Sequence, residues 1–257
     1  MKPDLSFLID LSKEAGAILK DGYGKKHDLE YKGLIDLVTE VDKKSEKLIV
    51  ERILASFPDH SIIAEEGGLT EGLKEHNWYI DPVDGTSNYA KGLPLFCVSI
   101  AYAFEGKMQL AAVYDPLRDE CFTGERGKGA SLNRDPIHVT DEHRLIHCML
   151  VTGFPYEMDQ ADNNLDHFVS LSHTVHSIRR LGSAVLDQVY VAAGRLDGYW
   201  EVGLYPWDIA AGTLIVEEAG GKVTNMKGEH DYMKPPYDVV MANPGLHEKF
   251  LQELNKK

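Results

Sequence analysis

The chain has 257 residues, 43% of them hydrophobic, and a formal charge of −14 from 41 acidic and 27 basic side chains. This excess of acids argues against non-specific nucleic-acid binding, which needs basic patches that displace phosphate counterions. A chain of this length can bury a substantial core, and no apolar run in it approaches the ~20 residues of a membrane span.

We expect a cytoplasmic protein with reduced cysteines. The three cysteines, Cys97, Cys121 and Cys148, are widely spaced among apolar residues, a pattern typical of buried free thiols rather than of disulfides or a zinc site. The first four residues, MKPD, do not begin a secretory signal peptide.

The hydrophobic pattern of the first half predicts helices followed by an antiparallel meander. Apolar residues between Leu5 and Leu19 recur at helical spacing and predict an amphipathic helix. Three apolar segments, at 98–104, 110–114 and 120–124, are separated by short turns and predict successive antiparallel strands.

The second half, after about residue 148, predicts alternating helices and strands. An apolar helix is expected with Ser183 as its N-cap and Gly194 as its stop. A strand at 196–201 and a final helix around Phe250 complete the pattern.

The most informative segment is 78–88, WYIDPVDGTSN. A short buried strand around Ile80 is expected to end there, and a proline and a glycine then allow Asp81 and Asp84 to converge beyond it. Carboxylate oxygens suit Mg²⁺, and the amides of residues 85–87 would face a phosphate if they open a helix. Asp, Pro and Gly are also ordinary turn formers, but a turn requires neither a second carboxylate nor the hydroxyl of Thr86.

Two further acids lie upstream of this segment. Glu65 follows the strand-like run 62–64 and precedes two glycines, a pattern that also fits a solvated turn. Asp42 stands where a helix N-cap belongs, and capping alone would explain it.

A third acid lies downstream. The segment 205–219 begins with YPWDIAAG and predicts a helix that stops at Gly220 and Gly221. Asp208 then lies at the positive end of the helix dipole, where a carboxylate is favoured.

Together, DPVDGTSN at 81–88 and WDIAAG at 207–212 resemble the two signature motifs of the inositol monophosphatase family, within the Mg²⁺-dependent, lithium-sensitive phosphatase superfamily. The likeness extends from about Lys32 to Asn243. It implies a layered α-β-α-β-α sandwich, an α/β fold of the inositol monophosphatase and fructose bisphosphatase type. It also implies a homodimer and inhibition by Li⁺.

The resemblance assigns metal ligands and catalytic residues. It implies that Glu65, Asp81 and the carbonyl of Val83 hold a first Mg²⁺, and that Asp81, Asp84 and Asp208 hold a second. Glu65 would also anchor a weaker third ion, and Mn²⁺ could substitute. Asp42 and Thr86, with Glu65, resemble the residues that activate the attacking water, and the amides of Gly85, Thr86 and Ser87 would contribute to phosphate binding.

The charges of these residues support metal dependence independently of the family resemblance. Five carboxylates in one cleft would repel a phosphate dianion unless divalent cations neutralise them. Two such ions about 4 Å apart can lower the pKa of a bound water and stabilise the leaving alkoxide, so no covalent phosphoenzyme is required. No cysteine or histidine stands beside the motifs as a nucleophile.

Substrate binding is expected in the second half. By resemblance, Gly182, Ser183, Ala184 and Glu201 line the sugar pocket, together with Asp84 and Asp208. Plain capping would also explain Ser183, and a solvated strand end would explain Glu201.

The expected activity is hydrolysis of inositol monophosphate, with other phosphate esters left open. Ser87 and Asn88 resemble the inositol phosphatase branch. The adjacent Arg179 and Arg180 would suit a second phosphate, as in a fructose-1,6-bisphosphatase or dual sugar phosphatase, and an NADP phosphatase is a further alternative. Lys32 resembles a family lysine near the site.

Two non-catalytic alternatives also follow from the resemblance. The chain could be a regulatory relative that keeps only the fold, or an active enzyme that also binds a protein of the transcription machinery. We expect two subdomains: 1–148 with most of the metal ligands, and 149–257 with Asp208 and the substrate pocket.

Overall fold

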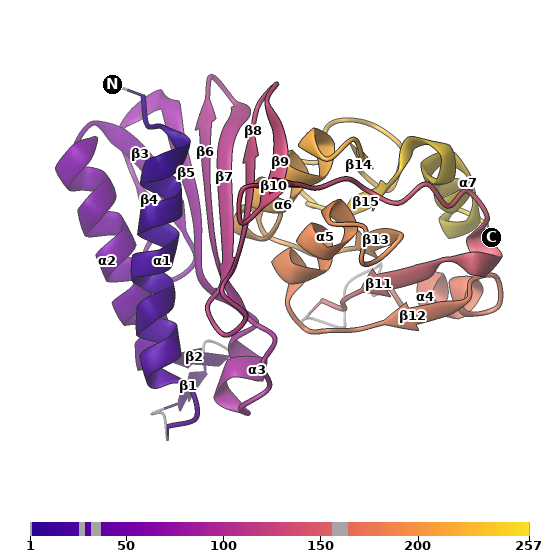
Figure 1. Cartoon of the computed structure of the whole chain (residues 1–257), viewed down its shortest axis with the longest axis horizontal. Helices are drawn as coiled ribbons and strands as arrows, with labels where there is room; N and C mark the ends of the chain where they lie inside the picture. Colours follow the sequence, from indigo (N-terminus) through magenta and orange to yellow (C-terminus); the bar gives the residue numbers. More distant parts are fainter. Residues whose placement is uncertain (1, 26–28, 32–36, 156–163, 257) are drawn as a thin grey trace.

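The computed structural model describes residues 2–25, 29–31, 37–155 and 164–256, and it forms five layers (Figure 1). Two helices cover the outer face of a large sheet, two more lie between that sheet and a smaller one, and the last two pack beyond the smaller sheet. In this order the helices are α1 (Leu5–Gly22) and α2 (Glu40–Ser56), α5 (Ala184–Ala192) and α6 (Pro206–Glu218), then α4 (Leu165–Ser172) and α7 (Pro244–Leu254). The predicted layered sandwich is confirmed.

The large sheet has eight strands in the order β10-β9-β8-β7-β6-β5-β3-β4. Only β3 and β5 pair in parallel; the other neighbours are antiparallel. The strands are β3 (His60–Ala64), β4 (Gly68–Thr70), β5 (Leu73–Asp84), β6 (Cys97–Phe104), β7 (Lys107–Asp115), β8 (Glu120–Glu125), β9 (Gly129–Leu132) and β10 (Asp135–Pro136). The predicted meander corresponds to β6, β7 and β8.

The smaller sheet has five strands in the order β12-β11-β13-β15-β14. They are β11 (Met149–Thr152), β12 (Ser177–Arg179), β13 (Gly198–Glu201), β14 (Lys222–Thr224) and β15 (Val239–Ala242). The remaining described elements are the pair β1 (Leu29–Tyr31) and β2 (Leu37–Thr39), the short helix α3 (Thr86–Ala90) and a 3₁₀ turn, Leu145–His147.

One hydrophobic core joins the two sheets through α5 and α6. It includes Val113 and Phe122 from the large sheet, Leu214 from α6 and Met241 from the small sheet, all fully buried. The sheets divide between residues 136 and 149, but because this core crosses the division, the subdomain boundary at 148 stays a prediction.

Two local predictions are wrong. The N-cap of α2 is Thr39, and Asp42 lies in the first turn, where its carboxylate accepts a hydrogen bond from the Thr39 amide at 3.1 Å. The T-x-x-D spacing forms a capping box, which the choice of Asp42 as cap overlooked. The strand around Ile80 does not end there: β5 continues to Asp84, because Asp81 and Asp84 still pair with β6 across a bulge.

Other predictions hold. The three cysteines are buried with free thiols, and none of the described helices has both the length and the apolar character to cross a membrane. Lys32 lies outside the described residues.

Candidate active site

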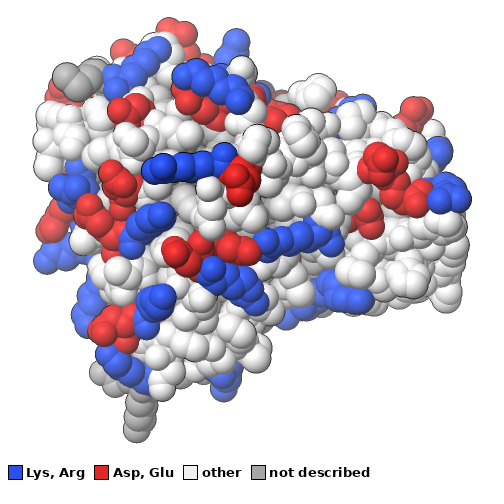
Figure 2. Space-filling view, in the orientation of Figure 1, with Lys and Arg blue, Asp and Glu red and all other residues white. Residues whose placement is uncertain are grey.

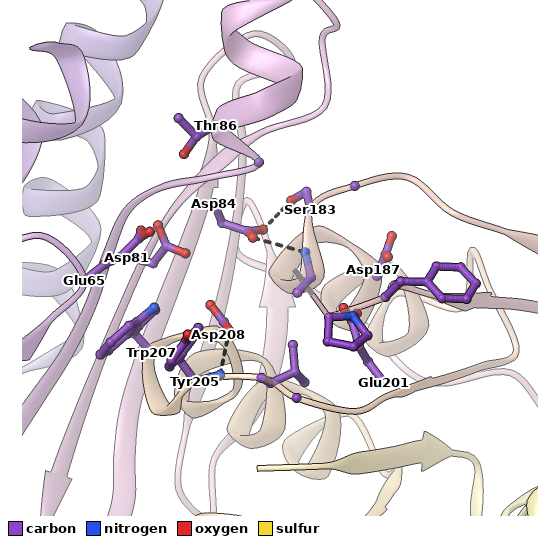
Figure 3. Close-up of a pocket in the computed structure, with 18 of the residues that line it drawn as sticks. Glu65, Asp81, Asp84, Thr86, Ser183, Asp187, Glu201, Tyr205, Trp207 and Asp208 are labelled. Atoms are coloured by element: carbon purple, nitrogen blue, oxygen red, sulfur yellow. Dashed lines mark hydrogen bonds between the residues drawn. The ribbon is translucent and has the colours of Figure 1, made fainter. Parts of the chain in front are cut away.

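Parallel pairing of β3 with β5 brings two of the predicted acids together. Ala64 lies opposite Ile80, and the amide of Glu65 donates to the carbonyl of Ile80 at 3.2 Å. Parallel strands end at the same edge of a sheet, so Glu65 and Asp81 lie side by side there (Figure 3). The loop after Glu65 is held from α2, where the carboxylate of Glu46 accepts a hydrogen bond from the Glu66 amide at 2.8 Å.

The bulge in β5 turns Asp84 toward the second half of the chain. Its carboxylate accepts hydrogen bonds from the hydroxyl of Ser183 and from the amides of Ala184 and Val185, at 3.1 and 2.9 Å. These groups form the N-terminus of α5, and Ser183 is its N-cap as predicted. Asp84 therefore connects segments about 100 residues apart in sequence.

Gly85 and Thr86 form the turn that follows Asp84. Gly85 adopts φ +92°, and a Cβ there would lie 2.8 Å from the Leu95 carbonyl, so both conformation and space require glycine. The hydroxyl of Thr86 lies 3.0 Å from Asp42 Oδ1 and 2.9 Å from the Val83 carbonyl. The predicted pair of Asp42 and Thr86 is thus in hydrogen-bonding contact.

Asp208 lies in the first turn of α6, as predicted. Its Oδ2 accepts a hydrogen bond from the Tyr205 amide at 2.7 Å. Its carbonyl accepts one from Gln188 Nε2 at 2.8 Å, which ties α6 to α5. Gly212 makes room for this contact, since a Cβ there would lie 2.0 Å from Gln188 Oε1.

One cavity of about 110 Å³, partly open to solvent, gathers most of the predicted site (Figure 3). The predicted residues that line it are Glu65, Asp81, Val83, Asp84, Gly85, Thr86, Gly182, Ser183, Ala184, Glu201 and Asp208. Two predicted residues do not: Asp42 is fully buried behind Thr86, and Ser87 is exposed outside the lining. The predicted role of the Ser87 amide stays a prediction.

The acids of the cavity raise one another's pKa. Burial, together with the charges of Glu65, Asp84 and Asp208, holds the pKa of Asp81 well above its ordinary value. Burial also raises the pKa of Asp84 and Asp208, although hydrogen bonds from neighbouring donors oppose the shift. Clustered buried carboxylates of this kind are stable as anions only when a cation compensates them.

The oxygen atoms of these residues suit Mg²⁺, although the side chains do not form a compact cluster. Among the described residues, no three Asp, Glu, His or Cys side chains form a ready-made cluster for a metal ion. The carboxylates of Asp84 and Asp208 instead accept hydrogen bonds from neighbouring backbone amides. Hard oxygen ligands from three segments that line one cavity, with a single described basic residue, Arg180, in that lining, are nevertheless what a divalent cation requires.

Glu201 lies in the lining at the end of β13, where it accepts a hydrogen bond from the Tyr199 hydroxyl at 2.8 Å. Burial raises the pKa of Glu201 to about 7. Gly153 lies against this carboxyl group, since a Cβ there would be 2.0 Å from Glu201 Oε1.

The sequence interpretation missed Asp187 and Gln188 on α5. Asp187 is 1% exposed, lines the cavity and stands next to Gln188 in a mostly apolar helix, AVLDQVYVA, and this pair of polar residues was the available signal. The two adjacent arginines are both exposed but have different surroundings. Arg180 lines the cavity, whereas the guanidinium of Arg179 donates a hydrogen bond to the carbonyl of Ile178.

The layered fold is that of inositol monophosphatases and their relatives. The structure matches that of an inositol monophosphatase from Anabaena with a TM-score of 0.88 and 41% identity, covering 97% of this chain and 94% of that one. It matches the extragenic suppressor protein suhB of Bartonella henselae with a TM-score of 0.93 and 36% identity, covering 98% of each chain.

The sequence comparisons agree. The model of the inositol monophosphatase family matches residues 1–257, so the chain belongs to that family. It is 44% identical to the Nus factor SuhB of Vibrio cholerae over 260 residues, covering 100% of this chain and 97% of the relative.

Proposed function

We propose that the chain is a Mg²⁺-dependent phosphomonoesterase that hydrolyses inositol monophosphate to inositol and phosphate. The observation that carries this proposal is the convergence of Glu65, Asp81, Asp84 and Asp208 on one cavity from three separate segments. Membership in the inositol monophosphatase family supports the same activity.

The four acids and the Val83 carbonyl would hold the Mg²⁺ ions. When bound, Mg²⁺ neutralises the carboxylates that would otherwise repel the phosphate and supplies acidity to water. The resemblance further predicts inhibition by Li⁺, substitution by Mn²⁺ and a homodimer, and the pattern of the cysteines predicts a cytoplasmic location.

The chain's own residues activate and position the reactants. The Thr86 hydroxyl lies within hydrogen-bonding distance of both Asp42 Oδ1 and the Val83 carbonyl. When it donates to Asp42, its lone pairs accept a hydrogen bond from the attacking water. The proton of that water passes through Thr86 to Asp42. The amides that follow Asp84 hold the phosphate, while Glu201 accepts hydrogen bonds from the hydroxyls of the leaving group.

The proposal is tested by phosphate release from inositol 1-phosphate, fructose 1,6-bisphosphate and NADP, with and without Mg²⁺. We expect the inositol ester to be preferred and Asp84→Asn to lose turnover while its circular dichroism stays that of the wild type. Wild-type rates in Asp84→Asn would contradict the metal assignment. Preference for fructose 1,6-bisphosphate would favour a dual sugar phosphatase, for which Arg180 in the lining is the supporting observation.

A second role is suggested by a relative, since the Vibrio cholerae protein is named a Nus factor. We propose that this chain serves as a Nus factor in addition to its catalysis. Complementation of a strain that lacks the chain tests this role: rescue by Asp84→Asn would support it, and failure of that folded but inactive variant would argue that only catalysis matters.

A further inference from the structure

The carboxylates of the cavity divide into two groups. Glu65, Asp81 and Asp208 gather on one side, with Asp84 between, and Asp187 and Glu201 lie on the other side (Figure 3). The first group, with Asp84, contains the proposed metal ligands. Asp187 and Glu201 are not among them, so bound metal ions leave these two acids to interact with something else.

One oxygen of the Asp187 carboxylate is buried and unpaired among the described residues. Its Oδ1 has no hydrogen bond within the described part of the chain, although the residue is only 1% exposed. A buried polar atom left unpaired is destabilising, and a fold that only needed a helical residue here would be more stable with an apolar one. The unpaired oxygen is therefore explained most simply by a ligand that is absent from the structure.

The position of Asp187 is fixed by a rigid element. It stands in the first turn of α5, where its amide donates to the Ser183 carbonyl at 3.1 Å. Helix α5 packs against α6 in the shared core, and the helix dipole favours a negative charge at this end. A carboxylate held in this way is preorganised to bind.

We propose that Asp187 binds the leaving group. Its carboxylate accepts a hydrogen bond from a hydroxyl of the polyol, next to the hydroxyl bound by Glu201. Two adjacent acids with only Arg180 as a described basic neighbour in the lining favour a neutral polyhydroxylated group and disfavour a second phosphate at that end. This inference rests on the proposed phosphomonoesterase activity and deepens it.

The substitution Asp187→Asn tests this inference, with Asp166→Asn as the matched control. Asp166 occupies the first turn of α4 but is exposed on the surface, away from the cavity. Asparagine keeps an acceptor oxygen but lacks the charge, and the weaker hydrogen bond should raise the KM for inositol 1-phosphate by about tenfold. The kcat should change little, because the bond is made equally in ground and transition states. The control should match the wild type in both constants.

Inhibition by the two products distinguishes binding at the polyol end of the cavity from binding at the phosphate end. In Asp187→Asn, inhibition by myo-inositol should weaken by about tenfold, while inhibition by inorganic phosphate stays that of the wild type. The KM for fructose 1,6-bisphosphate should stay the same or fall. The melting temperature should not fall, since the substituted carboxylate has no structural partner.

The outcomes are distinct. An active wild type whose KM and inositol inhibition are unchanged by Asp187→Asn would overturn the inference alone. Equal weakening of inhibition by inositol and by phosphate, with a lowered melting temperature, would show a structural role and also overturn it. A wild type that releases phosphate from none of the esters would overturn the proposed function and this inference with it.

Discussion

The hydroxyl of Thr86 lies 3.0 Å from Asp42 Oδ1, although 44 residues separate the two in the chain. Asp42 is fully buried, and burial raises its pKa while the hydrogen bonds from Thr39 and Thr86 oppose that shift. Of the described hydrogen-bond partners of Asp42, Thr39 and Thr86, only Thr86 lines the cavity. The threonine hydroxyl therefore connects the buried base to a water in the cavity.

Removing that hydroxyl should abolish most of the turnover. We expect Thr86→Ala to lower kcat by about 100-fold or more, because general base catalysis is lost. Thr86→Ser keeps the hydroxyl and should retain a rate within about tenfold of the wild type. Steady-state phosphate release measures both, and equal rates in the alanine and serine variants would contradict the proton route.

A side chain at position 153 should displace Glu201. Gly153→Ala places a methyl group 2.0 Å from Glu201 Oε1, so the variant should lose about 1–3 kcal/mol in its free energy of unfolding. Chemical denaturation measures the loss. If the clash is specific, Glu201→Ala should offset most of it in the double variant. Additive losses would show that the methyl group clashes with something else.

Asn88 joins the first half of the chain to the second. Its side-chain amide donates to the carbonyls of Leu95 and Leu181, both at 2.8 Å. Asn88→Ala leaves these acceptors unpaired and should cost about 1–3 kcal/mol in the free energy of unfolding. Asn88→Asp should cost more, since a carboxylate faces the same carbonyls. Thermal unfolding of the two variants checks the order, and an aspartate variant as stable as the wild type would contradict it.

His247 should make the protein less stable in acid. It is fully buried with Nε2 3.1 Å from Thr224 Oγ1, and burial, with the charge of Lys222 nearby, lowers its pKa from 6.5 to about 4. Between these values the unfolded chain binds a proton that the folded chain does not, so stability falls as the pH drops from about 6.5 to about 4. At about 1.4 kcal/mol per pKa unit, the contribution should be about 3 kcal/mol.

The substitution His247→Gln isolates this contribution. The difference in free energy of unfolding between the variant and the wild type should change across this pH range, in favour of the variant at the acid end. His173→Gln, at an exposed histidine beside α4, serves as the control and should show no such change. A pH-independent difference for His247→Gln would contradict the assignment.

Local patterns predicted the individual helices, the meander and the acids at the ends of segments, whereas the layered arrangement and the roles of the acids as metal ligands came from the family resemblance. Asp81 and Asp84 stand beside a proline and a glycine, and Asp208 lies in the first turn of a helix with small residues, so these acids are conspicuous in the sequence. The cap of α2 was missed because Thr39 and Asp42 both suit capping. Only the geometry shows that it is the Thr39 side chain that accepts the hydrogen bond from the Val41 amide.

The remaining features could not be predicted because they are contacts between distant segments. Gln188 supports Asp208 from another helix, and Gly153, just after β11, makes room for Glu201. Nothing in the residues next to each one indicates its partner. The burial of Asp187 beside the cavity likewise follows from how α5 packs in the shared core.

The most direct test of the account is the Mg²⁺ dependence of phosphate release from inositol 1-phosphate by metal-depleted protein. The account predicts no turnover without Mg²⁺ and a rate that rises to saturation as Mg²⁺ is added. Asp84→Asn should stay inactive across the titration. Turnover that is undiminished in EDTA would contradict the central claim that Glu65, Asp81, Asp84 and Asp208 hold the ions on which hydrolysis depends.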